Sequence, residues 1–508
     1  MNIDPNTPVV VGVGQAAERI DDPGYRAMSP VELAAAAARA ALEDCDAEFA
    51  SVAAVIDTVA GVRQFEISGP VATGPLGRSN NYPRSVANRL GANPARAILE
   101  VVGGQGPQHL INELAGQIAA GRCEAALIFG SDATSTLRYF ARAEAKPDFT
   151  ETVEGDLEDR GQGIDGLISR YTVVHGLIDA PTQYGLLENA RRAGTGLGPA
   201  DYLRRMGELF APFSKVAAGN PFAAAPVERT VEELITVTER NRMISNPYPR
   251  LMVARDQVNQ GAAALLMSVG TARRLGVPSD KWVFLHGHVD LEEQSLLERP
   301  DLGHAPSAVL AATEALDMAG IGVEDVATFD LYSCFPVPVF NICDGLGIAP
   351  DDPRGLTVTG GLPFFGGAGN NYSMHAVAET VTRMRRAPGH FGLVGANGGI
   401  LSKYSVGVYS TTPTAWQPER NAELQSRIDS GPTVPVTEIA DGPGTVETYT
   451  VRRDDGRPTG IIIGRLDDGS RFLSTTEDDE LIALLTDGDP LGARVRVRSF
   501  DYGNRCFP

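Results

Sequence analysis

The chain has 508 residues, a hydrophobic fraction of 43% and a formal net charge of −20. This length predicts roughly two to four domains, and the composition is typical of globular domains with sizeable cores. The negative charge argues against a nucleic acid or an anionic membrane as partner, because either would need a clustered basic surface.

The cysteines and the N-terminal segment predict a cytoplasmic protein. Five cysteines are scattered along the chain, an odd set that favours reduced thiols over a disulfide framework. None forms a Cys-x-x-Cys pair and no histidine cluster has ligand spacing, so no metal site is expected. No apolar run reaches the ~18 residues of a membrane-spanning helix. Residues 1–6 have neither the basic start nor the apolar core of a signal peptide.

The first part of the chain alternates predicted strands and helices. Residues 9–14 are uniformly apolar, as buried parallel strands are. Ser29 and Pro30 have the pattern of an N-cap and a first helical position, and an alanine-rich helix is predicted over 33–42. This alternation predicts an α/β fold with a mostly parallel sheet. Further strands are predicted at 52–59, 96–102 and 124–130, and further helices at 82–91 and 107–121.

A glycine-rich turn, Gly103–Gly106, lies between a predicted strand and a predicted helix. Many α/β enzymes place a nucleophile at such a turn, since the helix N-terminus stabilises developing negative charge. Here the turn reads Gly-Gly-Gln-Gly and offers no nucleophilic side chain. The position is that of an acyl-transfer site from which the nucleophile is missing.

The pattern of the first part returns later in the chain. Residues 38–43 align with 312–317, and at the same offset 52–53 align with 326–327 without a gap. We interpret this as an internal duplication, with chance similarity between two alanine-rich helices as the alternative. The second half has its own glycine pairs at 360–361 and 366–367, a predicted helix at 373–386, and predicted strands at 391–394 and 405–409.

Two further segments complete the predicted organisation. The insert 134–250 reads as irregular and is rich in Arg, Pro, Gly and aromatic residues, which is typical of a substrate-binding lid. The segment 436–508 has short strands separated by turn signals and predicts a small β-barrel of the OB type. The predicted domains are an N-terminal half, 1–281, which includes the insert 134–250, a C-terminal half, 282–412, a linker, 413–435, and the barrel, 436–508.

The duplicated βα core, the long insert and the glycine-rich turns resemble the thiolase superfamily over about residues 8–412. The resemblance is carried by Gly103–Gly106, by Tyr332–Phe335, which is similar to a His-Asp-Cys-Phe motif of sterol-carrier-type thiolases, and by 360–368 and 397–399. With its appended barrel, the chain resembles most the mycobacterial group of thiolase-like proteins type 1. The resemblance implies a duplicated, five-layer αβαβα thiolase fold plus a C-terminal OB-like or Greek-key β-barrel.

The resemblance also implies a chemistry whose side chains this chain lacks. Thiolases bind acyl-CoA and make or break a carbon–carbon bond with two cysteines and with histidines that build oxyanion holes. Position by position, the nucleophilic cysteine falls at Gly103, the acid/base cysteine at Ala396, and the two histidines at Tyr332 and Gly367. Glycine cannot carry an acyl group and alanine cannot move a proton, so ordinary thiolysis or Claisen condensation is not expected.

Four side chains near these positions are the catalytic candidates. Tyr332 is a hydrogen-bond donor or, with a depressed pKa, a base; otherwise it fills the volume of the lost histidine. Cys334 reads as a buried, inert thiol more readily than as a reactive one. His375, in the first turn of a predicted helix, either faces the pocket or is structural. Asn397 either offers an amide donor to a thioester oxygen or shapes the turn that follows it.

The glycines of two turns are expected to approach a bound CoA or acyl-CoA. They are Gly103, Gly104 and Gly106 in the first half, and Gly398 and Gly399 in the second. Arginines and lysines of the insert would meet the phosphates of this ligand.

Two hypotheses for function follow from the resemblance. One is an acyl-CoA enzyme that is acetyl-CoA acetyltransferase-like by family but acts as a retro-aldol lyase on β-hydroxyacyl-CoA, which needs no acyl-enzyme. Thiolase-like aldolases of this kind work with a separate OB-fold partner that 436–508 resembles, although the cysteine pairs of the partner's zinc-binding part are missing here. The other hypothesis is a non-catalytic acyl-CoA-binding protein of lipid metabolism. A monomer or a homodimer is expected, because thiolases dimerise through a core surface that an extra domain could cover.

Overall fold

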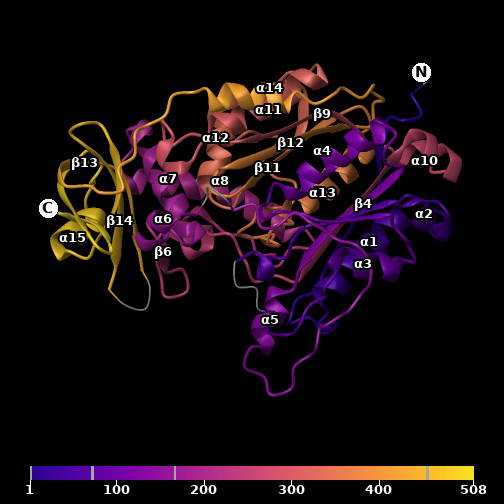
Figure 1. Cartoon of the computed structure of the whole chain (residues 1–508), viewed down its shortest axis with the longest axis horizontal. Helices are drawn as coiled ribbons and strands as arrows, with labels where there is room; N and C mark the ends of the chain where they lie inside the picture. Colours follow the sequence, from indigo (N-terminus) through magenta and orange to yellow (C-terminus); the bar gives the residue numbers. More distant parts are fainter. Residues whose placement is uncertain (1–2, 70–73, 165–167, 454–456) are drawn as a thin grey trace.

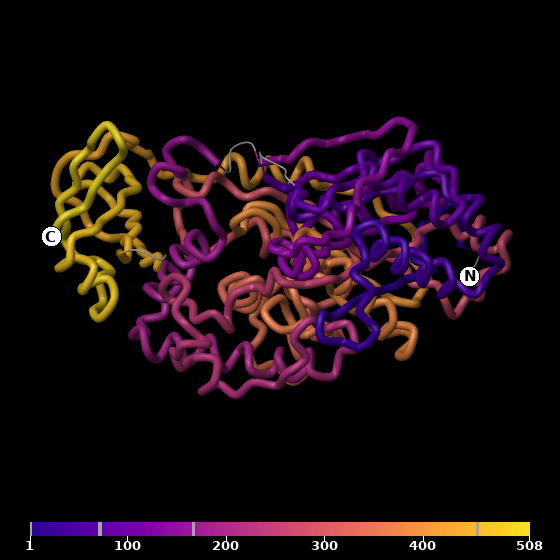
Figure 2. The backbone as a smooth tube through the Cα atoms, turned by 90° about the horizontal axis from the view of Figure 1, so that it is seen from below, coloured from indigo at the N-terminus to yellow at the C-terminus, as the bar shows by residue number. Residues whose placement is uncertain are grey.

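The computed structural model describes residues 3–69, 74–164, 168–453 and 457–508. The molecule is elongated, with a layered α/β core and the C-terminal barrel at one end (Figure 1). Figure 2 shows the barrel as a distinct lobe beside the core. Among the described residues, no helix combines the length and the hydropathy needed to cross a membrane.

The first half of the core is built on a mixed sheet with the strand order β1-β8-β4-β2-β3-β5. Strands β2, β3 and β4 are parallel, whereas β8 returns from the insert and runs antiparallel to β1 and β4. The expected start of α1 is confirmed, because Ser29 and Glu32 form a capping box. The bounds are β1 Pro8–Ala17, α1 Pro30–Asp44, α2 Phe49–Val55, β2 Thr58–Gly61, α3 Tyr82–Leu90, β3 Arg96–Leu99, α4 Gly106–Ala119, β4 Ala125–Asp132, β5 Glu158–Asp159, β8 Gln260–Ser268 and α10 Val269–Leu275.

The second half repeats this arrangement with fewer strands. Its sheet has the order β10-β11-β12-β9, in which β9, β12, β11 and β10 correspond to β1, β8, β4 and β2 in position and direction. The predicted duplication is therefore confirmed. The bounds are β9 Phe284–Glu292, α11 Pro306–Ala319, β10 Val326–Leu331, α12 Pro336–Leu346, α13 Tyr372–Arg386, β11 Phe391–Gly398 and β12 Lys403–Ser410.

Two central helices, α4 and α13, pack against each other between the two sheets (Figure 1). One buried cluster joins side chains of both helices and both sheets, with Leu110 and Leu114 from α4 and Val377 and Val381 from α13. Helices α1 and α3 cover the outer face of the first sheet, and α11 covers that of the second. This is the expected five-layer thiolase fold.

The sequence-based interpretation is wrong between α1 and β2. Residues 52–55, predicted as strand, belong to the short helix α2, and β2 begins only at Thr58. Glu48 caps α2 by accepting from the amides of Ala50 and Ser51. Because 326–327 begin a strand, the ungapped alignment of the two halves holds for α1 and α11 and fails beyond them.

The insert 134–250 is more regular than its composition indicates. Its two long helices, α7 Ala180–Thr195 and α8 Pro199–Ala218, place Tyr184, Tyr202 and Phe210 in the buried core of the second half. The insert therefore supports the second half as well as covering it. Its other elements are α5 Thr134–Phe140, α6 Arg170–Val174, α9 Val231–Ile235, β6 Met243–Ser245 and β7 Tyr248–Pro249.

The C-terminal segment forms the predicted barrel. Its strands follow the order β14-β15-β17-β16-β13, and β13 also pairs with β14, which closes the sheet. The sequence analysis missed β17, α15 and, inside the predicted linker, α14. The OB assignment and the domain boundaries stay predictions. The bounds are α14 Asn421–Asp429, β13 Gly442–Arg452, β14 Thr459–Leu466, β15 Arg471–Thr476, α15 Asp479–Asp487, β16 Arg494–Phe500 and β17 Gly503–Phe507.

A buried arginine attaches the barrel to the core. Arg471 is fully buried, pairs with Glu447 of the barrel, and donates to the carbonyls of Leu297 (2.8 Å) and Arg299 (2.6 Å) in the second half. The hairpin β6–β7 of the insert pairs with β13 through Ser245 and extends the barrel sheet. The barrel is thus docked on both the insert and the second half.

Candidate functional site

The turn Gly103–Gly106 is held in place by the second half of the chain. Gly103 has a φ of +144°, which glycine adopts without strain. Its amide donates to Oδ1 of Asn370 (3.0 Å), and the Ser373 hydroxyl donates to the carbonyl of Gly104. Both halves therefore build the turn.

Gln105 occupies the space into which a side chain at position 103 would point. A Cβ on Gly103 would overlap Oε1 of Gln105 and lie 2.9 Å from its Cδ, and a Cβ on Gly398 would overlap the same oxygen. The side chain is buried, and its Oε1 has no hydrogen-bond partner among the described residues. The sequence analysis did not select Gln105, although its place inside the turn was a signal.

The five glycines expected at the ligand differ in what their surroundings require. A Cβ would collide with neighbouring atoms at Gly103, Gly104 and Gly398, whereas at Gly106 the nearest atom would be 3.4 Å away. Gly399 has a φ of +61°. The lack of side chains at these glycines thus allows the two turns to pack against each other. The contact of the five glycines with a bound CoA or acyl-CoA stays a prediction.

Tyr332 lies directly against the first turn. A Cβ on Gly104 would lie 2.6 Å from Cε2 of this ring, so only glycine leaves room for it. Burial, and then the nearby Cys334 thiol, raise the pKa of Tyr332 above its ordinary value. The depressed pKa considered for Tyr332 is therefore wrong, and its hydroxyl is a proton donor at neutral pH. The catalytic role itself stays a prediction.

Cys334 and Asn397 belong to one buried cluster with Tyr184 of the insert. The amide nitrogen of Asn397 donates to the Tyr184 hydroxyl (2.7 Å) and lies 3.9 Å from the Cys334 sulfur. Burial raises the pKa of the Cys334 thiol to about 12, which favours the inert interpretation. The amide donor predicted for a thioester is thus engaged with Tyr184. The free atom of Asn397 is Oδ1, a buried acceptor without a partner among the described residues.

His375 is positioned by contacts with β1 and with the loop before α13. Its Nδ1 lies 2.7 Å from Oε1 of Gln15, and its ring packs 5.0 Å from that of Phe365. Burial lowers the pKa of His375 to about 3, so the ring is neutral. These contacts favour the structural alternative over a role in the pocket.

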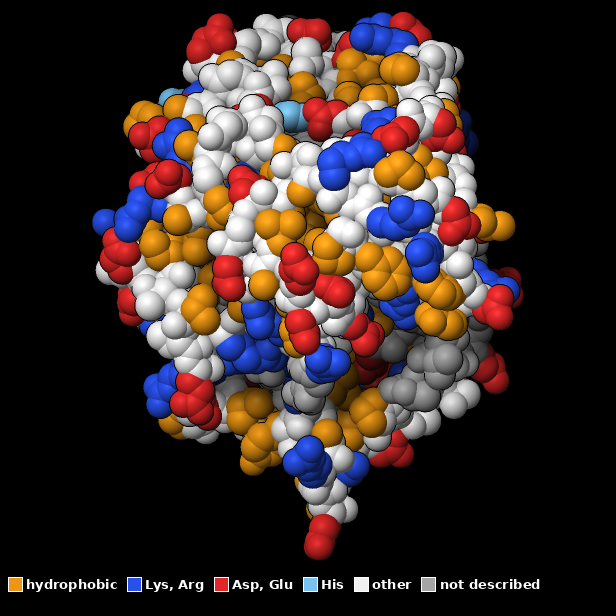
Figure 3. Space-filling model, turned by 90° about the vertical axis from the view of Figure 1, so that its left-hand side faces the viewer, with side chains coloured by type: hydrophobic (Ala, Val, Ile, Leu, Met, Phe, Trp, Pro, Cys, Tyr) orange, Lys and Arg blue, Asp and Glu red, His pale blue; other side chains and the backbone are white. Residues whose placement is uncertain are grey.

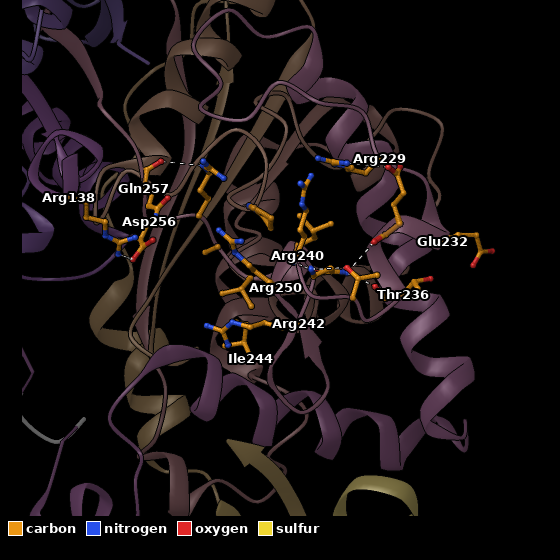
Figure 4. A pocket seen from close by; sticks show the side chains of 18 residues that line it. Arg138, Arg229, Glu232, Thr236, Arg240, Arg242, Ile244, Arg250, Asp256 and Gln257 are labelled. Carbon is orange, nitrogen blue, oxygen red and sulfur yellow. Dashed lines mark hydrogen bonds and ion pairs between the residues drawn. The ribbon is translucent and has the colours of Figure 1, made fainter. Parts of the chain in front are cut away.

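A cleft of about 1030 Å³ lies between the insert and the loop before β8 (Figure 4). We call it the arginine cleft. Two of its arginines are paired, Arg138 with Asp256 and Arg229 with Glu233 (3.2 Å). Figure 4 shows Arg240, Arg242 and Arg250 between these pairs, and the described residues give these three side chains no ion pair. The charged residues that line the cleft are Arg138, Arg229, Arg240, Arg242, Arg250, Arg255, Glu232, Glu233 and Asp256.

The arginine cleft reaches the second half beside the candidate site. Ala254, which lines it, donates its amide to the carbonyl of Cys334 (3.2 Å). Burial and then the charge of Arg250 lower the pKa of Arg255, whereas the carboxylate of Asp256 opposes this shift in part. The cleft therefore suits an anionic ligand. The sequence analysis expected basic residues of the insert to bind a ligand but could not say which.

Glu100, His109 and Glu113 are the one described group whose spacing would permit a metal ion. A cation already lies among them, because Nη1 of Arg160 is 2.7 Å from a carboxylate oxygen of both Glu100 and Glu113. Burial opposes protonation of His109, yet its hydrogen bond and charge interaction with Asp290 raise its pKa to about 9. A protonated imidazole does not bind a metal. The expectation that no metal is used stays a prediction.

Comparisons with known proteins agree with this architecture. Residues 423–501 match the family described as thiolase-like protein type 1 additional C-terminal domain. The crystal structure of a monomeric SCP2-thiolase-like protein type 1 from Mycobacterium smegmatis is 58% identical in sequence, with 99% of each chain covered and a TM-score of 0.87. A comparison with curated proteins found no match.

More distant solved structures share the fold of the core. An Ltp2-ChsH2(DUF35) aldolase is 19% identical, with 80% of this chain and 98% of that chain covered and a TM-score of 0.57. The dimeric peroxisomal thiolase of Saccharomyces cerevisiae is 14% identical, with the same coverage and a TM-score of 0.55. At these identities the similarity concerns the fold alone.

Proposed function

Because this chain belongs to the SCP2-thiolase-like proteins of type 1, we propose that it binds an acyl-CoA thioester without forming the acyl-enzyme of ordinary thiolases. The observation that carries the proposal is the arginine cleft, which reaches Ala254, one backbone hydrogen bond from Cys334. A ligand with its phosphates in this cleft would extend its other end toward the glycine-rich turns.

The charge of the cleft suits the nucleotide end of CoA. Arg240, Arg242 and Arg250 present guanidinium groups that no described carboxylate neutralises. Guanidinium groups bind phosphate oxygens through paired hydrogen bonds, and CoA carries a pyrophosphate and a 3′-phosphate. Binding would relieve the mutual repulsion of these arginines.

The glycine-rich turn opposes covalent catalysis. Position 103 has no side chain, and the Gln105 amide occupies the space that a nucleophile would need. Cys334 does not replace it, because a thiol with a pKa of about 12 is almost entirely protonated at neutral pH. Acyl transfer through a thioester on the protein is therefore not expected.

A retro-aldol lyase is the second candidate, and the position of Tyr332 favours it. The ring lies on Gly104, and a hydroxyl that burial keeps protonated can donate to a thioester oxygen as it gains enolate charge. The N-terminus of α4 would add partial positive charge there. A solved aldolase of the same fold adds an analogy.

Isothermal titration calorimetry with CoA, acetyl-CoA and acetoacetyl-CoA tests the binding proposal. We expect the double variant Arg240→Gln/Arg250→Gln to weaken binding by at least about tenfold. Arg122→Gln/Arg386→Gln removes the same charge from exposed sites on the core and serves as the control. No heat from the wild type with any of these ligands would refute the proposal.

Product assays separate the two candidates. Thiolysis of acetoacetyl-CoA should stay at background in both cases. Release of an aldehyde or ketone from a panel of β-hydroxyacyl-CoAs, slowed roughly 10²- to 10⁴-fold in Tyr332→Phe, would support the lyase. Binding without release would support a non-catalytic protein. Release that Tyr332→Phe leaves unchanged would contradict the role given to this residue.

A further inference from the structure

The hairpin formed by β16 and β17 exposes arginines and aromatic rings on one face. Val495 and Val497 point into the barrel, so the alternate positions Arg496, Arg498 and Phe500 point outward. In register with them on β17, Phe507 lies opposite Arg496 and Arg505 lies opposite Arg498. We call the outward residues Arg496, Arg498, Phe500, Tyr502, Arg505 and Phe507 the hairpin face.

The aromatic rings of the hairpin face are unusually exposed. Tyr502 is 60% exposed and Phe500 41%, and their rings stack with centroids 5.6 Å apart. The guanidinium of Arg505 lies 5.2 Å from the Tyr502 ring centre. Beside them, Ile439 is 74% exposed, and the next residue donates its amide to Asn504 of β17. Apolar rings and guanidinium groups therefore lie next to each other on the hairpin face.

The positive charge of the hairpin face is not balanced by ion pairs. Like charges directly opposite each other, as Arg498 and Arg505 are, destabilise an antiparallel pair. The described residues provide no ion pair for Arg496 or Arg498, whereas Arg494 on the same strand pairs with Asp467 (2.7 Å). This strand therefore neutralises an arginine at one end and leaves two unneutralised along the hairpin face.

Acids lie close to the hairpin face, but the described residues show no ion pair between them and Arg496 or Arg498. Asp501 lies in the turn between Phe500 and Tyr502, and Asp441 accepts the amide of Ser499 through Oδ1 (3.2 Å). Glu477 and Asp478 border a hollow of about 370 Å³ beside Arg505. Asp478 accepts the amides of Glu480 and Leu481 and so caps α15. The opposed arginines Arg498 and Arg505 thus reduce the stability of an exposed strand pair, and such exceptions to the rules of sheet stability are common at functional surfaces.

We infer that the hairpin face is a docking surface for an acidic protein that presents apolar side chains among its carboxylates. Arg, Tyr and Phe are the residues enriched at protein–protein interfaces and at their energetic centres. The barrel lies at one end of the molecule (Figure 1), and Figure 3, which views that end, shows basic, acidic and hydrophobic side chains interspersed on its surface. A partner can therefore reach this surface without covering the core.

Net charge favours a compact partner over an extended polyanion. The whole chain carries −20, so a nucleic acid or an anionic membrane would also meet acidic surface. Interactions between solvent-exposed charges farther apart than about 8 Å are largely screened at physiological salt. A protein that contacts only the hairpin face would interact mainly with its arginines and rings.

Fluorescence anisotropy with the full chain tests the inference. The probe is a labelled 20-residue peptide in which Glu and Asp alternate with Leu and Phe, and its comparison peptide has Lys in place of every acid. We expect the acidic peptide alone to bind, more weakly at high salt, and at least about tenfold more weakly to Arg496→Glu/Arg498→Glu. Phe500→Ser/Tyr502→Ser should weaken it too, since the rings supply apolar contact.

A matched control separates the hairpin face from net charge. Arg122→Glu/Arg386→Glu makes the same charge change at exposed sites on the core and should bind like the wild type. Absence of binding, or equal loss in this control, would overturn the inference. Preferential binding of a single-stranded oligonucleotide or of phosphatidylserine vesicles would overturn it as well. Analytical ultracentrifugation could also overturn the inference. If the wild type sediments as a dimer and Arg496→Glu/Arg498→Glu as a monomer, a second copy of the chain occupies the hairpin face.

Discussion

The substitution Gly103→Ala should destabilise the protein, and a second substitution at Gln105 should restore part of the loss. At a φ of +144° a residue other than glycine costs on the order of 1–3 kcal/mol. The added Cβ would also overlap Oε1 of Gln105 and lie 2.9 Å from its Cδ and 3.0 Å from its Nε2. The amide has little room to retreat, because a Cβ on Gly398 would lie only 2.8 Å from the same Cδ.

The two costs can be separated by a double-mutant cycle. Displacing a buried side chain adds roughly 1–3 kcal/mol, so Gly103→Ala should cost about 2–6 kcal/mol in all. In Gly103→Ala/Gln105→Ala the steric part disappears and only the backbone strain remains. We therefore expect a coupling free energy of about 1–3 kcal/mol that favours the double variant over the sum of the single ones.

Differential scanning calorimetry of the wild type, both single variants and the double variant measures this coupling. Gly106→Ala is the control, since its Cβ would meet the nearest atom at 3.4 Å and should leave the unfolding temperature almost unchanged. Simple additivity would refute the claim that Gln105 fills the space at position 103. An unchanged unfolding temperature for Gly103→Ala would refute the backbone argument.

Three further predictions concern buried charges. Burial raises the pKa of Asp132, whose Oδ2 has no described partner, to about 8, so its carboxyl makes the folded state lose stability as pH rises from about 4 to 8. Asp132→Asn should remove this loss, and calorimetry should find its advantage over the wild type growing from pH 5 to 8; a constant difference would contradict the argument. For His375 the pH dependence has the opposite sign. Because its pKa is about 3 in the folded state, only the unfolded chain takes up a proton as pH falls below about 6.5, and the folded state therefore loses stability from pH 6.5 toward pH 3. The variant His375→Gln should lose less free energy of unfolding over the same pH interval. Arg471→Met leaves the carbonyls of Leu297 and Arg299 without this donor and leaves Glu447 with Arg465 as its described ion-pair partner. An unsatisfied buried polar group costs roughly 1–3 kcal/mol, and trypsin should then cut within 413–435 faster than in the wild type; equal digestion would show that other contacts hold the barrel.

The sequence predicted those helices, strands and turns whose signals lie within a few neighbouring residues. The Ser29 cap, the glycine turn before α4 and the alternating strands of the barrel are all set within a few positions of the chain. The short helix α2 escaped because its seven residues, six of them apolar, fit a strand as well as a helix. The helix α8 escaped because Pro212 lies inside it and the composition of the insert outweighed its apolar spacing.

The positions of the site residues were predictable, but most of their surroundings were not. The resemblance placed Tyr332, Cys334 and Asn397 near the turn, and the structure brings them close to it. No local pattern could show that Tyr184, 213 residues before Asn397, engages its amide. Similarly, no local pattern could show that burial lowers the pKa of His375 to about 3.

The dependence of the first turn on the second half has a consequence for the order in which the protein is made. Asn370 and Ser373 follow the residues they hold by 267 and 269 positions. At the speed of translation, about 5–20 residues per second, the turn and α4 emerge on the order of 10–50 s before these partners. During that interval the inner apolar face that α13 later covers is open to water and to other chains. The emerging first half thus passes through an aggregation-prone stage, and a chain that stops before α13 has no complete turn to offer any ligand.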